Sequence, residues 1–324
     1  MSTYKQIAGT NIEVLSSDPA NPVDGQVWYN STSNTVKANF NDPGSWSTGG
    51  ALNTARYQLG GVGTQTSSLA FGGGAPETGA TESYNGTSWT ELNDLNTARQ
   101  GMGGAGIQTA AIAFGGEGSG IPGPIPGINE SWNGTSWTEV NDLNTGRVRL
   151  AGAGIQTSAL AFGGEETGPP FSITGATESY NGTSWTEVND LNTGRLRLAG
   201  VGADNTSALA IGGDSPILTL TESWNGTSWT EVNDLNNGRE LLSAAGIQTS
   251  ALAFGGSPPG GLAYTESWNG TSWTEVNDLN TARNGLGGAG IQTSALAFGG
   301  DAPPFSAATE EWNVGPQTIT FTDS

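Results

Sequence analysis

The chain has 324 residues, 52 of them glycine, and its 30 acidic residues outnumber 10 basic ones for a formal net charge of −20. An acidic chain repels phosphate groups, so we expect no nucleic-acid partner and no anionic membrane surface. The chain has neither cysteine nor histidine, which excludes disulfides and removes the commonest catalytic base and transition-metal ligand. The first residues are too polar for a signal peptide and no apolar stretch could span a bilayer, so we expect neither secretion nor membrane insertion.

Residues 1–43 lie outside the pattern that fills the rest of the chain. Residues 25–30 and 35–40 are predicted to form a β-hairpin around residues 31–34. The segment PVDGQVWYNSTSNTVK resembles a short module near the N-termini of bacteriophage tail and other virion proteins. Its combination with near-identical repeats resembles proteins of marine bacteriophages. The resemblance implies a virion protein, assembled in the host cytoplasm and attached to other virion proteins through residues 1–43.

From about residue 53 the chain repeats one unit six times. Each unit has an Arg and then a Gly/Ala-rich run that leads to Gly-Gly. In five units Glu-Ser, an aromatic residue and Asn-Gly-Thr-Ser-Trp follow, whereas the sixth has Glu-Glu-Trp-Asn. A period of roughly 45 residues indicates supersecondary units that cannot bury their apolar faces alone. The arginines of the six units are Arg56, Arg99, Arg147, Arg195, Arg239 and Arg283.

Each unit is predicted to form four short antiparallel strands. The Gly/Ala run, the segment before Gly-Gly, the Glu-Ser segment and the Ser-Trp-Thr-Glu segment supply them in that order. Asn-Gly between the last two strands predicts a type I′ turn with positive φ at both residues. Four-stranded sheets at this spacing are typical of β-propeller blades, and small residues fit the crowded innermost strand. These pairs begin at Asn85, Asn133, Asn181, Asn225 and Asn269.

Residues 50–313 resemble the kelch repeat in the string GAGIQTSALAFGG and the ESWNGTSW that follows it. The resemblance implies an all-β, six-bladed β-propeller of four-stranded kelch-like blades. The last unit breaks after Asn313, while residues 44–48 match the fourth strand of the other units. We therefore expect an N-terminal strand clasp, with residues 44–48 beside residues 308–313. Alternatively residues 318–322 supply that strand, add an outer strand or pair with the N-terminal region. The expected domains are residues 1–43 and 44–324.

Two places vary among otherwise copied units: the connection from strand two to strand three, and the pair of residues after the Arg. In a four-stranded meander both emerge on the same face. This favours a recognition face, although unconstrained loops also vary. Apolar side chains in the connections favour recognition over drift. The candidate ligand-binding residues are Tyr57, Arg149, Phe171, Arg197, Ile217, Leu218, Glu240, Tyr264 and Phe305.

The six repeated arginines are expected to form a ring on this face. They could bind a carboxylate or sulfate, but we favour a structural role in which each pairs with the Asp of an Asn-Asp-Leu-Asn loop. Arg149 and Arg197 lie outside the repeated pattern and are better candidates for ligand contact. The repeated tryptophans are expected to pack between blades rather than to stack on sugars. The loop aspartates are Asp94, Asp142, Asp190, Asp234 and Asp278.

The kelch resemblance extends to copper-radical galactose oxidase, whose chemistry needs histidine ligands and a tyrosine–cysteine crosslink. This chain has neither histidine nor cysteine, and no repeat holds a distinct pair of carboxylates. We therefore expect no enzyme, no metal and no cofactor. The predicted function is a tail- or fibre-associated virion protein whose loop face binds a host-surface glycan or protein, or a virion partner. A stand-alone lectin-like or scaffold propeller is the alternative.

Overall fold

The computed structural model describes residues 12–20, 23, 25–41, 43–74, 76–118, 127–166, 172–214, 216–257 and 260–321. Every regular element formed by these residues is a β-strand. They divide into two compact units, Trp46–Trp312 and a smaller unit made of Met1–Ser45 together with Asn313–Ser324. Phe171, one of the predicted ligand contacts, lies outside the described residues.

The described residues form eight sheets, seven of four strands and one of three. In the large unit the repeats give these four-stranded sheets: β5 (Gly60–Thr64), β6 (Ser67–Phe71), β7 (Thr81–Tyr84) and β8 (Trp89–Glu91); β9 (Gly103–Ile107), β10 (Ala110–Phe114), β11 (Asn129–Trp132) and β12 (Trp137–Val140); β14 (Ala151–Ile155), β15 (Ser158–Phe162), β18 (Thr177–Tyr180) and β19 (Trp185–Val188); β20 (Ala199–Asp204), β21 (Ser207–Ile211), β22 (Thr221–Trp224) and β23 (Trp229–Glu231); β24 (Ser243–Ile247), β25 (Ser250–Phe254), β26 (Thr265–Trp268) and β27 (Trp273–Val276); and β28 (Gly287–Ile291), β29 (Ser294–Phe298), β30 (Thr309–Asn313) and β4 (Ser45–Gly49).

The number of sheets exceeds the six blades expected from the repeat. One additional four-stranded sheet belongs to the small unit. The three-stranded sheet arises from connections within the third repeat, and consists of β13 (Arg147–Val148), β16 (Glu165–Glu166) and β17 (Ser172–Ile173).

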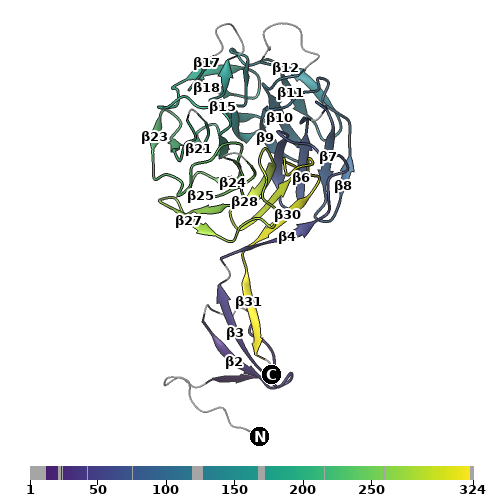
Figure 1. Cartoon of the computed structure of the whole chain (residues 1–324), viewed down its shortest axis with the longest axis vertical. Coiled ribbons are helices and arrows are strands. Elements are labelled where there is room, and N and C mark those ends of the chain that lie inside the picture. Colours follow the sequence, from purple (N-terminus) through teal and green to yellow (C-terminus); the bar gives the residue numbers. More distant parts are fainter. Residues whose placement is uncertain are drawn as a thin grey trace. The chain divides into compact units, whose positions relative to one another are not determined.

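The first strand of each repeat lies innermost, and these strands contact one another in a closed order: β5, β9, β14, β20, β24, β28 and again β5. Figure 1 shows the sheets fanning outward around this centre. Small residues make the approach possible. A Cβ at Gly152 would lie 2.6 Å from the carbonyl oxygen of Gly104, and a Cβ at Gly104 would lie 2.7 Å from the ring of Phe71. The Gly/Ala composition of these strands is therefore a packing requirement.

Tryptophans from the fourth strands fill the spaces between neighbouring sheets, as predicted. The Trp137 ring lies edge-on to Phe71 at 5.2 Å, and the Trp185 ring lies edge-on to Phe114 at 4.9 Å. In each pair the two rings come from adjacent sheets, and both are buried. These rings form part of the apolar layer that holds the sheets together, since edge-to-face aromatic pairs add to the effect of area burial.

The predicted type I′ turn at Asn-Gly is wrong. Tyr84 pairs with Trp89 across the hairpin, so the loop has four residues rather than two. Among the loop residues only Gly86 has a positive φ, of 88°. The Asn85 side-chain oxygen accepts hydrogen bonds of 2.9 Å from the N–H groups of Thr87 and Ser88. The asparagine therefore organises the loop through its side chain rather than through a left-handed backbone.

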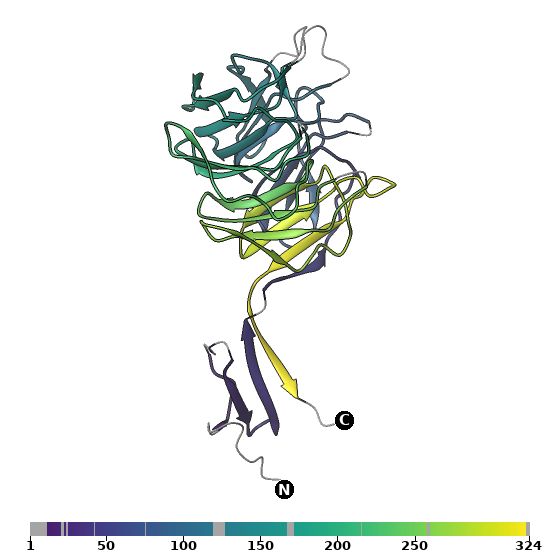
Figure 2. The same ribbon diagram turned by 60° about the vertical axis from the view of Figure 1, so that its left-hand side comes forward.

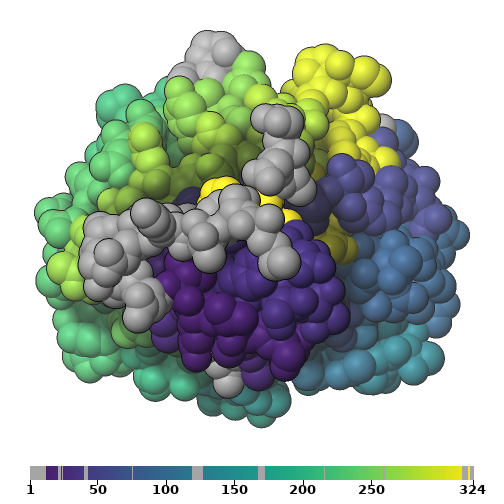
Figure 3. Space-filling view, turned by 90° about the horizontal axis from the view of Figure 1, so that it is seen from below, coloured from purple at the N-terminus to yellow at the C-terminus, as the bar shows by residue number. Residues whose placement is uncertain are grey.

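The small unit is one sheet in the order β1 (Glu13–Leu15), β2 (Val27–Asn30), β3 (Thr35–Asn41) and β31 (Pro316–Phe321). The predicted hairpin is confirmed, with Asn30 opposite Thr35. Trp28 is fully buried, and Asp18 accepts hydrogen bonds from Trp28, Asn30 and Lys37. In Figure 3 the described residues of the N-terminal part, in purple, form one continuous surface.

The C-terminal strand belongs to the small unit, whereas the expected domain division placed it with the repeats. β31 pairs antiparallel with β3, from Val36 opposite Phe321 to Asn41 opposite Pro316, so Asn313–Ser324 groups with the small unit (Figure 2). The alternative in which residues 318–322 complete the last repeat is therefore wrong for the described part of that segment. In the last sheet of the large unit, β4 is the neighbour of β30.

Candidate functional site

The two variable places of the repeat lie side by side. The residue after each repeated Arg forms a bridge with the residue after Gly-Gly, as between Tyr57 and Gly74 or between Glu240 and Ser257. In the third repeat the same pairing joins Val148 to Glu165. We call the surface formed by these bridged residues and the connections that follow them the variable face.

At the centre of this face, a closed ring of backbone hydrogen bonds links the repeats. Each ring residue donates its N–H to the carbonyl of the ring residue in the preceding repeat, over 2.6 to 3.0 Å. Sequence reasoning did not find this ring, which we call the mouth ring. Its members, in order, are Gln58, Gly101, Arg149, Arg197, Leu241 and Gly285.

All six residues of the mouth ring adopt the left-handed backbone conformation, with φ between 51° and 63°. A non-glycine residue in this region costs about 1–2 kcal/mol relative to the right-handed region. Glycine occupies two of the six positions, so the fold does not need a side chain there. The other four positions carry Gln, Arg, Arg and Leu despite that cost. Strained residues of this kind cluster at functional sites.

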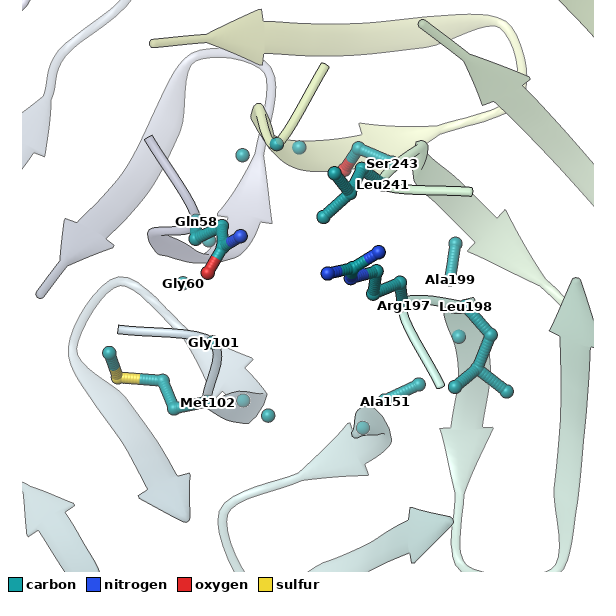
Figure 4. Close-up of a pocket in the computed structure, with 18 of the residues that line it drawn as sticks. Gln58, Gly60, Gly101, Met102, Ala151, Arg197, Leu198, Ala199, Leu241 and Ser243 are labelled. Carbon is teal, nitrogen blue, oxygen red and sulfur yellow. The ribbon is translucent and has the colours of Figure 1, made fainter. Parts of the chain in front are cut away.

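The mouth ring opens onto a cavity of about 160 Å³. Gln58 and Arg197 project toward its centre from opposite sides, with Leu241 beside Ser243 (Figure 4). Farther along the innermost strands a second cavity of about 90 Å³ is lined by Gly, Ala and Val residues. Polar and charged side chains are therefore concentrated at the variable face, whereas the walls farther in are small and uncharged.

The two unrepeated arginines are each held between carboxylates. Arg149 lies 3.0 Å from both Glu117 and Glu165. Arg197 lies 2.9 Å from Glu240 and 3.5 Å from Asp214. All six side chains are between 14% and 32% exposed, so the pairs are only partly desolvated.

The structure thus brings together three of the candidate residues, Arg149, Arg197 and Glu240. Sequence reasoning missed the acidic partners Glu117, Glu165 and Asp214. Their position in the repeat could have indicated them, because each of the three directly follows a Gly-Gly pair.

An aromatic pair lies beside the mouth ring. Tyr57 of the first repeat stacks on Phe305 of the last, with ring centroids 4.9 Å apart and planes at 15°. Phe305 is 41% exposed. A Cβ at Gly285 would lie 3.4 Å from the Tyr57 ring, which places that ring next to the mouth ring.

Three polar atoms of residues that line the cavity have no hydrogen-bond partner among the described residues. They are the side-chain oxygen of Gln58 and the Nε atoms of Arg149 and Arg197. The Nε atoms of the buried repeated arginines are also unpartnered, so among these atoms the Gln58 oxygen is the one that distinguishes the mouth.

The other described candidate residues lie away from the cavity lining. Ile217 and Tyr264 are 40% and 41% exposed, and Leu218 is half-buried, with its N–H donating to Gly213. They belong to the strand-two-to-strand-three connections of the fourth and fifth repeats. The structure therefore separates the predicted candidates into a central group at the mouth and a peripheral group.

The ring of repeated arginines is not on the surface. These side chains are at most 1% exposed, and each pairs with the Glu at the second position of the third strand in its own repeat, as Arg99 does with Glu130 at 3.2 Å. The predicted pairing with the loop aspartates is wrong. Asp94, for example, instead accepts a hydrogen bond from the N–H of Thr81. The arginine–glutamate pairs are Arg56–Glu82, Arg99–Glu130, Arg147–Glu178, Arg195–Glu222, Arg239–Glu266 and Arg283–Glu310.

Burial explains how these arginines act. Arg99 donates to the carbonyls of Gly115, Ile128 and Ala113 at 2.6 to 3.0 Å, and so joins the second strand to the connection that follows it. Burial lowers the pKa of the Arg99 guanidinium, and the charge of Glu130 opposes that shift. A charge so enclosed has a structural role and cannot contact a ligand on the face.

Among the described residues, no cluster of three or more Asp or Glu side chains is arranged to hold a metal ion. The same residues contain no helix that could span a membrane.

Comparison with known proteins gives a fold but no family. No family model and no curated protein matches the chain. The solved structure titled "Structure of YjhT", a propeller-type protein, superposes with a TM-score of 0.68 at 15% sequence identity, covering 82% of this chain and 99% of that one. The fold is a β-propeller. At this identity the likeness extends to the fold alone.

Proposed function

We propose that this chain is a non-enzymatic, virion-associated protein, a six-bladed kelch-like propeller whose variable face binds a host-surface glycan or protein, or a virion partner. On this proposal the variable face supplies recognition, and the small unit attaches the propeller to other virion proteins. The virion setting itself rests on the resemblance of the N-terminal segment to tail-protein modules.

Six blades closed by an N-terminal strand are supported by the contacts of Trp46. Its indole N–H donates to the hydroxyl of Thr265 at 3.1 Å, and its ring packs at 5.1 Å from Phe254. Trp137 makes the equivalent pair of contacts with Thr81 and Phe71 in the preceding sheet. Trp46 of β4 thus occupies the position of a fourth-strand tryptophan in the last repeat. We infer that β4 is the clasp that completes the sixth blade.

A binding role for the variable face is supported above all by the mouth ring. Four of its six positions keep a side chain where glycine would relieve backbone strain, and two of those side chains, Gln58 and Arg197, point into the cavity. A purely structural channel would gain stability from glycine at every position. The side chains at these four positions therefore support a role in contacting a ligand at the mouth. Many copies on one particle would make weak binding at each mouth effective.

The role of the small unit is tested by removing its two segments together, since β31 pairs with β3. A variant lacking residues 1–43 and 314–324 should keep ligand binding but lose incorporation into the assembly. Incorporation of that variant at the wild-type level would favour the alternative of a stand-alone lectin-like or scaffold propeller.

The binding role is tested with purified protein on candidate host cells and on isolated virion proteins. The informative variant carries Gln58→Gly, Arg149→Gly, Arg197→Gly and Leu241→Gly. Every position of the mouth ring is then glycine, as Gly101 and Gly285 already are. The control is Ile107→Ala, because Ile107 is 51% exposed at the end of β9 and does not line the mouth cavity. Binding that is lost in the glycine variant and kept in the control supports the proposal. Binding unchanged in both would overturn it.

A further inference from the structure

We infer that the mouth of the variable face binds an uncharged, hydroxyl-rich ligand, such as a neutral saccharide chain, on the side of the mouth ring where Gln58 lies between Gly285 and Gly101. This inference rests on the proposed function, because it names the ligand class of the same face. Its evidence is the charge around the mouth, the unpartnered polar atoms, and the aromatic pair next to Gly285.

The charge around the mouth disfavours an anionic ligand. The two guanidinium groups, Arg149 and Arg197, are already paired with the carboxylates of four side chains, so the cluster carries a net charge of −2. An anion at either guanidinium would lie close to these carboxylates and be repelled by them. A cation would in turn compete with the arginines for the same carboxylates. An uncharged ligand disturbs neither set of ion pairs.

The unpartnered atoms at the mouth include both an acceptor and donors. The Gln58 oxygen can accept hydrogen bonds, and the Nε–H groups of Arg149 and Arg197 can donate them. A hydroxyl group donates one hydrogen bond and accepts others, so it can satisfy either kind of atom. A carboxylate or sulfate only accepts and would leave the Gln58 amide oxygen unpaired. A ligand with several hydroxyls therefore fits the arrangement best.

The Gln58 side of the ring is the open side, because glycine occupies the neighbouring position on each flank. A Cβ at Gly285 would meet both Gln58 Cγ and the Tyr57 ring at 3.4 Å, so a longer side chain would occupy space next to both residues. The pair formed by half-buried Tyr57 and exposed Phe305 at this edge offers an apolar surface beside polar groups. The C–H face of a sugar ring packs on such an aromatic pair while its hydroxyls reach the mouth.

The test is binding of the full chain to an array of microbial oligosaccharides that includes neutral, anionic and amine-bearing members. We expect the glycans that bind to be neutral, and the same free oligosaccharides to compete for binding to host cells. The inference is overturned if the binders are anionic or amine-bearing, or if no glycan on the array binds.

Two variants localise the site. Gly285→Leu places a leucine at the open side of the ring. The ring already contains a leucine in the same backbone conformation, Leu241, so we expect the variant to fold. It should bind neutral glycan about tenfold more weakly, or not at all. Tyr57→Ala should weaken binding in the same direction, and Ile107→Ala should leave it unchanged. If both mouth variants bind neutral glycan as tightly as the wild type, the inference is wrong.

The inference and the proposed function can fail separately. If cell binding depends on the mouth side chains but neutral glycans do not compete, the proposed function stands and the ligand class is wrong. If no mouth variant changes cell binding, the variable face is not the binding surface, and both the proposed function and the inferred ligand class are wrong.

Discussion

The N–H of Gln58 donates a hydrogen bond of 2.6 Å to the carbonyl oxygen of Gly285. Gln58 follows the first repeated arginine and Gly285 follows the last, so this bond joins residues far apart in the chain and closes the mouth ring. Closure holds every ring residue in the same left-handed conformation, whatever its side chain. The backbone of the mouth is therefore uniform while its side chains differ, which separates what the fold requires from what a ligand would contact.

The first prediction concerns backbone strain in the mouth ring. Gln58→Gly should raise the free energy of unfolding by up to about 1 kcal/mol, because relief of the left-handed conformation exceeds the entropy lost by ordering a glycine. Gly285→Leu should lower it by about 1 kcal/mol for the converse reason. Urea unfolding of the two variants measures both changes. Destabilisation by Gln58→Gly would contradict the view that this side chain is retained for binding.

The second prediction separates buried from exposed arginines. Arg99→Leu should lower the free energy of unfolding by about 3–5 kcal/mol, because it leaves Glu130 as an uncompensated buried charge. Arg197→Leu at the mouth should change it by at most about 1 kcal/mol, since its ion pairs are partly exposed. Thermal or chemical unfolding compares the two. Similar losses in both variants would mean that the repeated arginines are not the buried supports described above.

The third prediction tests the proposed clasp. Trp46→Ala should destabilise the protein by about 3–5 kcal/mol, as should Trp137→Ala, because the two side chains are 6% and 5% exposed and make equivalent contacts. Chemical unfolding of the two variants provides the comparison. A loss of less than about 1 kcal/mol for Trp46→Ala, beside a large loss for Trp137→Ala, would show that β4 does not complete a blade.

The fourth prediction concerns acid stability of the small unit. The hydrogen bond from Lys37 is the largest cause that lowers the pKa of Asp18 from 3.8 to about 2, followed by those from Asn30 and Trp28. Because the folded pKa lies below the unfolded one, the stabilisation is fully present above pH 3.8 and is lost as the pH falls through about 2.

An NMR titration of the Asp18 carboxyl group measures this pKa directly. Thermal unfolding adds a second measurement, because the difference between wild type and Asp18→Asn should shrink over the same pH range. A carboxyl group that titrates at its ordinary value would refute the network around Asp18.

Periodicity by itself determined much of the architecture. Repetition of the Arg, the Gly-Gly pair and the tryptophan established four strands per unit, small residues on the innermost strand and tryptophans between sheets. These features follow from local chemistry copied many times, which is why they could be read without coordinates. The hairpin of residues 27–41 was equally readable, because its strands are adjacent in sequence.

Only the tertiary structure decided which residues meet across repeats. Whether Arg99 pairs with Glu130 or Asp142 depends on strand packing, because both carboxylates follow Arg99 in the chain and their spacing does not choose between them. The pairing of β31 with β3 joins the two ends of the chain, which no local pattern specifies. The mouth ring is likewise invisible in the sequence, because its hydrogen bonds use backbone groups that every residue carries, and closure alone brings Gln58 to Gly285.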